Sequence, residues 1–168
     1  YLIPGLCFIL LLLIGLGLVL YPLVSNWYSE QVRSTVETQY NETVAQMEDE
    51  NIEEALRAAQ EYNQSLCSVQ LDPDMEVGNY YELLNLSGNG VMGYVEIPAI
   101  DVNLPIYHSV NETSLQKGAG HMIGTSLPVG GKNTHVVISA HSAMSSARMF
   151  TDLDQLQEGD MILLHVLG

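Results

Sequence analysis

The pattern of apolar and polar residues opens on a long hydrophobic run. Residues 1–29 carry no charged side chain. A helix needs roughly 20 apolar residues to cross the hydrocarbon core of a bilayer, and residues 2–24 supply that length. Aromatic residues typical of a membrane interface follow the apolar run or end it: Tyr21, Trp27 and Tyr28. The pattern predicts a transmembrane anchor with its interface over residues 1–28.

A cleaved signal peptide is the alternative interpretation of this run. The apolar region of a signal peptide is usually only ~7–15 residues long. The run here is longer, lacks an Ala-x-Ala ending and continues into a helical pattern, which favours a retained anchor. Arg33 is the one cation close behind the run, and this scarcity favours the following domain lying outside the cell. We therefore expect a cell-membrane protein with an extracytoplasmic domain.

Residues 29–67 are mostly polar, and the stretch 30–66 contains neither Gly nor Pro. Asn51 followed by Glu54 resembles a capping box, which predicts a second helix start there. A stalk of two helices, or of one bent helix, is expected. A coiled coil is the competing interpretation, but too few heptads are strong. The positions that recur at helical spacing are Val32, Val36, Tyr40, Val44 and Met47, then Ile52, Leu56, Ala59 and Asn63.

Residues 68–89 are a linker-like segment rich in turn formers, and Asn89-Gly90 is a turn signal. After it the periodicity changes to that of strands. Strands that dominate over short helices favour a mainly β domain, a small barrel or a sandwich. The predicted strands cover residues 91–97, 102–106, 134–140 and 161–166, and the short helices cover 113–117 and 146–156.

The predicted strands are too few for a closed domain. Four strands cannot close a barrel of usual size, and the last apolar run, 161–167, reaches nearly to Gly168. We therefore expect residues 90–168 to form the first part of a β-barrel whose sheet is incomplete.

Charge and histidine pattern limit the chemistry. The formal net charge of −15 argues against nucleic acid as a partner, because phosphate binding needs clustered Lys and Arg. No histidine has metal-ligand spacing with cysteine or carboxylate support, so no metal and no cofactor is expected. His141 differs from the others because it ends a strand pattern and opens onto a small-residue loop. The histidines expected to be structural are His108, His121, His135 and His165.

The two cysteines give a weak signal. Cys7 lies inside the apolar run and Cys67 follows the helical stretch, so no disulfide is expected. A papain-like pair of Cys67 and His141 would need a stabilised thiolate. Cys67 instead follows a helix C-terminus, where the helix dipole disfavours the thiolate. This argues against Cys67 as a nucleophile.

Six motifs together resemble the class C, pilin-polymerising sortases, and the resemblance covers nearly the whole chain. Any one motif alone would be weak, but the set is specific. They are LYPLVSNW at 20–27, GVMGYVEIP at 90–98, LPIYH at 104–108, GAGH at 118–121, GTSLPVGG at 124–131 and MFTDL at 149–153.

The resemblance implies an eight-stranded β-barrel on a membrane tether in Gram-positive bacteria. It implies a cysteine transpeptidase that cleaves an LPxTG-like sorting signal through a thioacyl intermediate, which a pilin lysine resolves as an isopeptide bond. His141 aligns with the catalytic histidine, a general acid and base. The family's cysteine, in a TLxTC strand, and its arginine are expected beyond Gly168, so these residues alone would be an N-terminal part and inactive.

Two positions depart from the family pattern. His141 is followed by Ser142-Ala143, where the family usually has Arg-Gly. The lid motif is usually Asp-Pro-aromatic, and here it reads Asp72-Pro73-Asp74. A carboxylate beside a thiolate disfavours the thiolate rather than shielding it, so we expect a looser lid. The alternative function is a non-catalytic, membrane-tethered binding module or an inactive sortase fragment.

Overall fold

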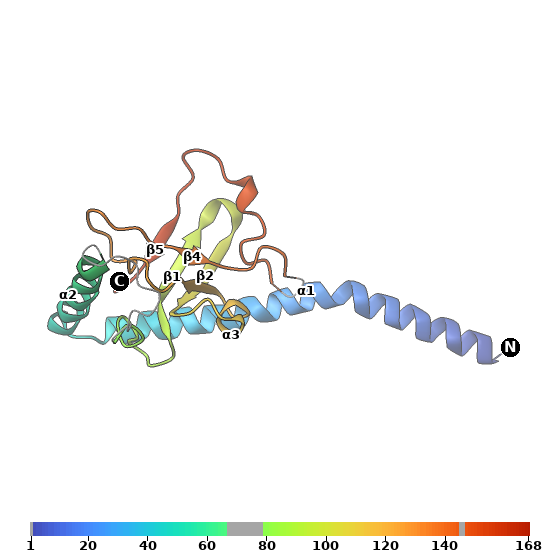
Figure 1. The fold of residues 1–168 in the computed structure, drawn as a ribbon. Coiled ribbons are helices and arrows are strands. Elements are labelled where there is room, and N and C mark those ends of the chain that lie inside the picture. The colour runs from blue at the N-terminus through green and yellow to red at the C-terminus, as the bar shows by residue number, and fades with distance from the viewer. Residues whose placement is uncertain (1, 67–78, 145–146) are drawn as a thin grey trace.

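The computed structural model describes residues 2–66, 79–144 and 147–168. Two long helices precede a small mixed sheet (Figure 1). The helices are α1 (Leu2–Ala45), α2 (Asp49–Leu66) and α3 (Glu112–Leu115), with the 3-10 turns η1 (Pro98–Ile100) and η2 (Leu153–Gln155). The strands are β1 (Val91–Ile97), β2 (Val102–Tyr107), β3 (Ala119–His121), β4 (Ile138–Ser139) and β5 (Leu163–His165).

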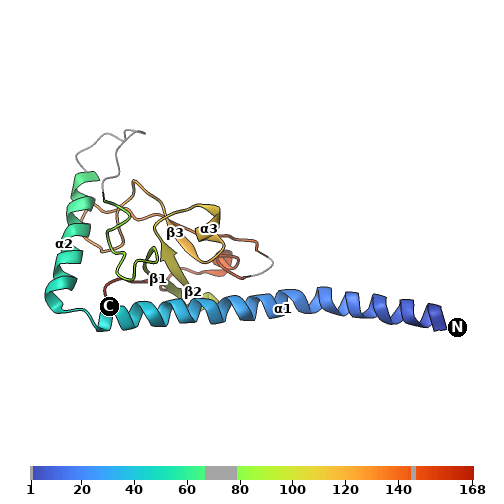
Figure 2. The same ribbon diagram turned by 90° about the horizontal axis from the view of Figure 1, so that it is seen from below.

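Helix α1 joins the predicted anchor and the start of the predicted stalk without a break. Its N-terminal half projects away from the domain, and its C-terminal half runs along the sheet (Figures 1 and 2). The side chains of the projecting half are exposed from Leu6 to Val24. Within the described residues, this helix is the one that is long and apolar enough to cross a membrane.

The domain packs on one face of the C-terminal half of α1. The predicted stripe is confirmed at Val36, Tyr40 and Val44, which contact β1 residue Val91 and its neighbours. The Tyr40 hydroxyl donates to the Met92 carbonyl oxygen at 3.1 Å and accepts from the Leu167 N–H at 3.1 Å. Tyr40 therefore ties α1 both to β1 and to the segment that follows β5.

The first position of that stripe was predicted wrongly. Val32 is 45% exposed, whereas the neighbouring Arg33 is 8% exposed. The helix face that meets the domain turns gradually toward Arg33, because a straight helix with 3.6 residues per turn does not keep a four-residue spacing on one line.

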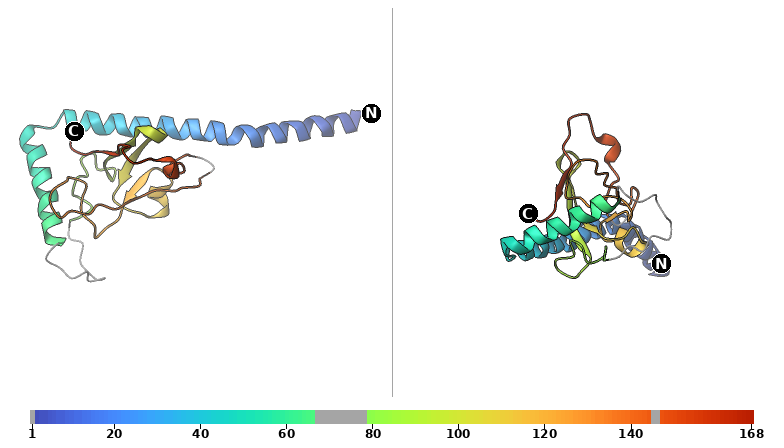
Figure 3. Two further views of the ribbon diagram at one scale, coloured as in Figure 1. Left: turned by 90° about the horizontal axis from the view of Figure 1, so that it is seen from above. Right: turned by 60° about the vertical axis from the view of Figure 1, so that its left-hand side comes forward.

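Helix α2 leaves the end of α1 at a steep angle, and the C-terminus of the chain lies near their junction (Figure 3). It begins at Asp49, two residues before the predicted capping box. Its buried face contains Ala59 and Asn63, as the second predicted stripe indicated. The stalk region is therefore two helices and not one bent helix.

The sheet is open, with strand order β4-β3-β2-β1-β5. Strands β2 and β3 are parallel, and the other neighbours are antiparallel. The predicted strands at 91–97 and 102–106 are confirmed. The expected mainly β domain with an incomplete sheet is thus present in the described residues.

Several sequence-based boundaries were wrong. The strand predicted at 134–140 is reduced to β4, because residues 135–137 bond the 122–126 turn instead of a neighbouring strand. In that turn Ser126 Oγ accepts from the His135 N–H at 3.1 Å, and Thr125 Oγ1 accepts from the Val137 N–H at 3.3 Å. The strand predicted at 161–166 contracts to β5.

The predicted helix at 146–156 is also wrong, since its described part contains only η2. Met149 adopts a φ of 40°, which no α-helix accommodates. The helix predicted at 113–117 appears as α3, shifted to Glu112 and capped by Asn111, whose Oδ1 accepts from the Ser114 N–H at 2.9 Å.

Strand β3 was missed because three residues carry no periodicity. Its GAGH motif has a packing reason. A Cβ on Gly118 would lie 2.5 Å from the Pro105 carbonyl oxygen, and one on Gly120 would collide with the Ser109 carbonyl oxygen. Only glycine lets β3 approach β2 and the following turn this closely. The largest core cluster includes Tyr80, Met92, Ile97, Leu104, Ile106, Ala119, Leu127 and Met149.

Candidate active site

His141 lies two residues after β4, at the edge of the sheet. Its carbonyl oxygen accepts a hydrogen bond from the Phe150 N–H at 2.9 Å. This bond closes the base of the loop that follows the histidine. At the far side of the loop, Ala147 and Met149 are buried at 3% and 2% exposure, so the core holds the loop's returning arm.

The imidazole of His141 has an unused nitrogen. Its Nε2 atom is shielded from solvent and has no hydrogen-bond partner among the described residues, although the side chain as a whole is 32% exposed. The nearest carboxylate oxygen recorded is Glu112 Oε1 at 3.6 Å, too long for a hydrogen bond. Glu112 is anchored by Gln116, whose Nε2 donates to the same oxygen at 3.0 Å.

This arrangement can hold a proton and release it. When His141 carries two protons, Glu112 is an opposite charge within ion-pair distance. When it is neutral, a free Nε2 can take a proton from a group placed beside it. These are the properties of a general acid and base.

His121 illustrates a structural histidine by contrast. It is fully buried, and its Nδ1 lies 2.6 Å from the Tyr80 hydroxyl while its Nε2 lies 2.8 Å from the Ser126 carbonyl oxygen. A neutral ring with hydrogen on Nε2 satisfies both contacts. Burial lowers the pKa of His121, and burial likewise raises the pKa of Tyr80. The expected structural role is confirmed.

His108 and His165 are also held by partners. His108 Nδ1 lies 2.9 Å from the Gly90 carbonyl oxygen, and its Nε2 lies 2.5 Å from that of Leu83. These two contacts link the His108 ring to the backbone at Leu83 and at Gly90. His165 stacks on Tyr94 and bonds Glu96 at 2.9 Å. His135 is exposed, so the structure gives it no buried role.

The other predicted site residues fall elsewhere. Cys67 and the lid residues Asp72, Pro73 and Asp74 lie outside the described residues, and their roles stay predictions. Cys7 is exposed on α1, inside the apolar run. Across residues 2–66, 79–144 and 147–168, no three His, Cys, Asp or Glu side chains are grouped to hold a metal ion.

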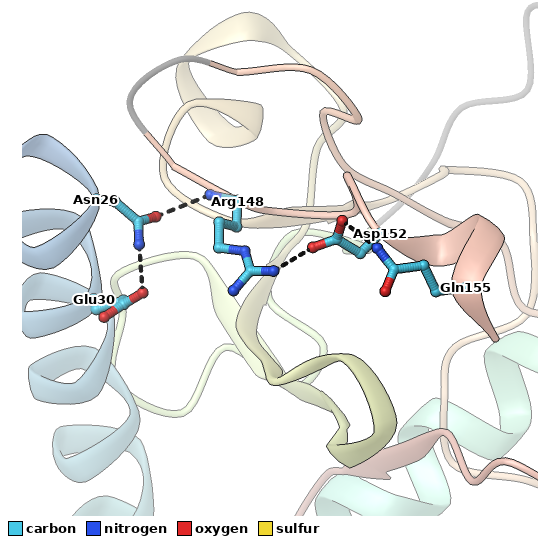
Figure 4. A network of polar contacts seen from close by, with 5 residues as sticks. All are labelled: Asn26, Glu30, Arg148, Asp152 and Gln155. Atoms are coloured by element: carbon cyan, nitrogen blue, oxygen red, sulfur yellow. Dashed lines mark hydrogen bonds and ion pairs between the residues drawn. The ribbon is translucent and has the colours of Figure 1, made fainter. Parts of the chain in front are cut away.

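A polar network near the site was missed by sequence reasoning. Asn26 Oδ1 on α1 accepts from the backbone N–H of Arg148 at 3.1 Å, and its Nδ2 donates to Glu30 at 2.7 Å (Figure 4). The Arg148 guanidinium donates to Asp152 at 2.6 Å, and Gln155 donates to the same carboxylate at 2.8 Å. No sequence signal joins Asn26 and Arg148, which are 122 residues apart.

Residues 95–168 match the sortase domain family model. Sortase A of Streptococcus agalactiae serotype III is 32% identical over 77 residues, which are 44% of this chain and 31% of that protein. The chain thus matches about a third of the length of this curated relative.

Two crystal structures resemble most of the fold. Sortase C of Streptococcus pneumoniae is 45% identical, with a TM-score of 0.70, over 79% of this chain and 68% of that one. Sortase C1 of S. agalactiae is 33% identical, with a TM-score of 0.74, over 80% of this chain and 71% of that one. The chain therefore belongs to the sortase family, in its class C branch.

Proposed function

We propose that this protein is a membrane-anchored cysteine transpeptidase that cleaves LPxTG-like sorting signals and joins pilin subunits by isopeptide bonds. Membership of the sortase family supports the reaction class, and the class C neighbours support pilin as substrate. The apolar half of α1 supports a membrane anchor. The scarcity of cations close behind the apolar run, where only Arg33 lies, supports a domain on the outer side of the membrane.

The observation that carries this proposal is the free Nε2 of His141 beside Glu112. A nitrogen that is shielded from water, and that has no hydrogen-bond partner among the described residues, is ready to exchange a proton with a substrate amine. The resemblance to class C sortases implies that the attacking sulfur comes from a cysteine of a TLxTC-type strand and that an arginine stabilises the oxyanion.

The reaction then proceeds in two steps, acylation of the enzyme and transfer to the lysine. The thiolate attacks the carbonyl carbon of the substrate threonine, the Thr–Gly bond breaks, and His141 gives its proton to the leaving glycine amine. A pilin lysine amine next attacks the thioacyl carbon and loses a proton to His141. The thiolate leaves, and an isopeptide bond remains.

The lid is a further part of this proposal. Asp72 and Pro73 keep the family pattern, and Asp74 replaces the aromatic residue. We expect a lid that covers the catalytic thiol poorly. Replacing Asp74 by Trp should slow labelling of that thiol by a mild electrophile, and an unchanged labelling rate would show that residue 74 does not gate the site.

The test of the function uses the complete membrane protein with an LPxTG-like peptide and a pilin domain that presents the acceptor lysine. Mass spectrometry should find cleavage between Thr and Gly and a new isopeptide bond to the lysine. Peptide binding without cleavage would favour the alternative, a tethered binding module. Labelling of Cys67 in place of a downstream cysteine would favour a papain-like site.

A further inference from the structure

A groove of about 430 Å³ lies between α1 and the sheet, just beyond the apolar run. Strand β2 meets the C-terminal half of α1, and this helix forms one wall of the groove (Figures 1 and 2). The groove is lined by apolar and aromatic side chains and by two cations. Its lining includes Tyr28, Val32, Arg33, Pro105, Tyr107 and Lys117.

The cations of this groove are unusual in so acidic a chain. The sequence has only 5 Lys and Arg against 20 Asp and Glu, and two of the cations, Arg33 and Lys117, line this groove. Among the described residues, no carboxylate lies within 4.0 Å of either cation. Glu30 acts on Arg33 only from a longer range, and its carboxylate accepts from Asn26.

Arg33 is the more informative of the two, because it is 8% exposed. Its guanidinium nitrogens are not among the described buried polar atoms that lack a partner, so they reach the solvent of the groove that Arg33 lines. Its fork of N–H donors matches the oxygen atoms of a phosphate group. A phosphate in the groove would have Arg33 as one cationic contact and Lys117 as a second.

The membrane end of the groove lies close to the layer of lipid headgroups. Arg33 follows Val24, the last residue of the apolar run, by nine positions, or about 13 Å of helix axis. Helical side chains lean back toward the N-terminus, so the guanidinium reaches toward the level of Tyr28. The headgroup layer extends roughly 5–8 Å beyond the hydrocarbon core, which places the membrane end of the groove beside it.

We propose that this groove binds the headgroup of an anionic phospholipid, with its phosphate on Arg33 and Lys117 and its glycerol against Val32, Pro105 and Tyr107. The groove would then set the orientation of the domain on the membrane surface. This inference does not depend on the transpeptidase activity.

Native mass spectrometry of the complete, delipidated protein in detergent tests this site, with phosphatidylglycerol and phosphatidylcholine of identical acyl chains as probes. Phosphatidylglycerol should bind the wild-type protein more tightly than phosphatidylcholine does. Arg33→Gln and Lys117→Gln should each weaken its binding by roughly tenfold, the loss expected for one charge-assisted hydrogen bond. Lys132→Gln removes an exposed cation that does not line the groove and should change nothing.

Two of the variants separate loss of charge from loss of folding. Arg33→Lys retains the charge and should keep much of the preference for phosphatidylglycerol. Lys117 is exposed, so Lys117→Gln tests the site even if a change at Arg33 disturbs folding. Equal retention of the two lipids, or no loss in Lys117→Gln, would overturn the proposal. So would displacement of phosphatidylglycerol by millimolar inorganic phosphate, or occupation of the groove by another segment of the chain.

Discussion

Asn26 and Arg148 connect the membrane-proximal part of α1 to the segment that follows His141. The Asn26 side-chain oxygen accepts from the Arg148 N–H at 3.1 Å (Figure 4). Two residues further on, the Phe150 N–H donates to the His141 carbonyl oxygen at 2.9 Å. The helix that leaves the apolar run therefore supports the returning arm of the His141 loop.

Replacing Asn26 by Ala should loosen that arm. The Arg148 N–H loses its partner but can bond water, so the cost should be about 0.5–1.5 kcal/mol. Hydrogen exchange should show faster exchange at the Arg148 amide. The control is Asn103→Ala, which removes a different contact of α1, the 2.7 Å bond between Asn103 of β2 and Glu37. If both variants changed exchange at Arg148 equally, the link would not be specific.

The buried pair of Tyr80 and His121 should make stability depend on pH. Burial lowers the pKa of His121 below its ordinary value of 6.5, so the unfolded chain takes up this proton more readily than the folded protein. The stability that His121 contributes is full above about pH 6.5 and is lost as the pH falls below it. Unfolding of the wild-type protein and of His121→Gln, measured between pH 7.5 and pH 5, should show a difference that shrinks toward acid. A difference that is constant with pH would refute the neutral, buried assignment.

Asn63 should be a main support of α2. Its Nδ2 donates to the Leu127 carbonyl oxygen at 3.1 Å, and its Oδ1 accepts from the Leu127 N–H at 2.6 Å. Asn63→Ala leaves the buried Leu127 N–H unsatisfied, while the Leu127 carbonyl oxygen still accepts from the Val129 N–H at 2.9 Å, so the change should cost about 1–3 kcal/mol. Denaturant unfolding of Asn63→Ala against the exposed control Gln64→Ala measures this. A loss no larger than that of the control would mean that α2 does not depend on this contact.

Much of the fold could be predicted where a repeating pattern is long. The apolar run, the α2 stripe and the strands β1 and β2 each extend over several periods, so the hydrophobic pattern alone located them. Strand β3 has three residues and β4 has two, too few for a period. Residues 135–137 have a strand-like composition, but the N–H groups of His135 and Val137 donate to the side-chain hydroxyls of Ser126 and Thr125 instead of to a neighbouring strand.

The candidate site was only partly visible in the sequence. His141 stood out because it ended a strand pattern and preceded small residues. Glu112 and Asn26 could not be found, because each meets the His141 region through the tertiary fold. Apolar neighbours indicated the buried roles of His108 and His121 but not their partners, and the same signal was wrong for His135, which is exposed.

The proposed role of His141 is tested most directly by peptide cleavage in His141→Ala and His135→Ala versions of the complete protein. His135 is an exposed histidine six positions earlier in the chain, so its loss removes an imidazole without touching the free Nε2 beside Glu112. The account predicts that kcat/KM for an LPxTG-like peptide falls by about 10²–10⁴ in His141→Ala and stays near wild type in His135→Ala. Wild-type cleavage by a folded His141→Ala protein would contradict it.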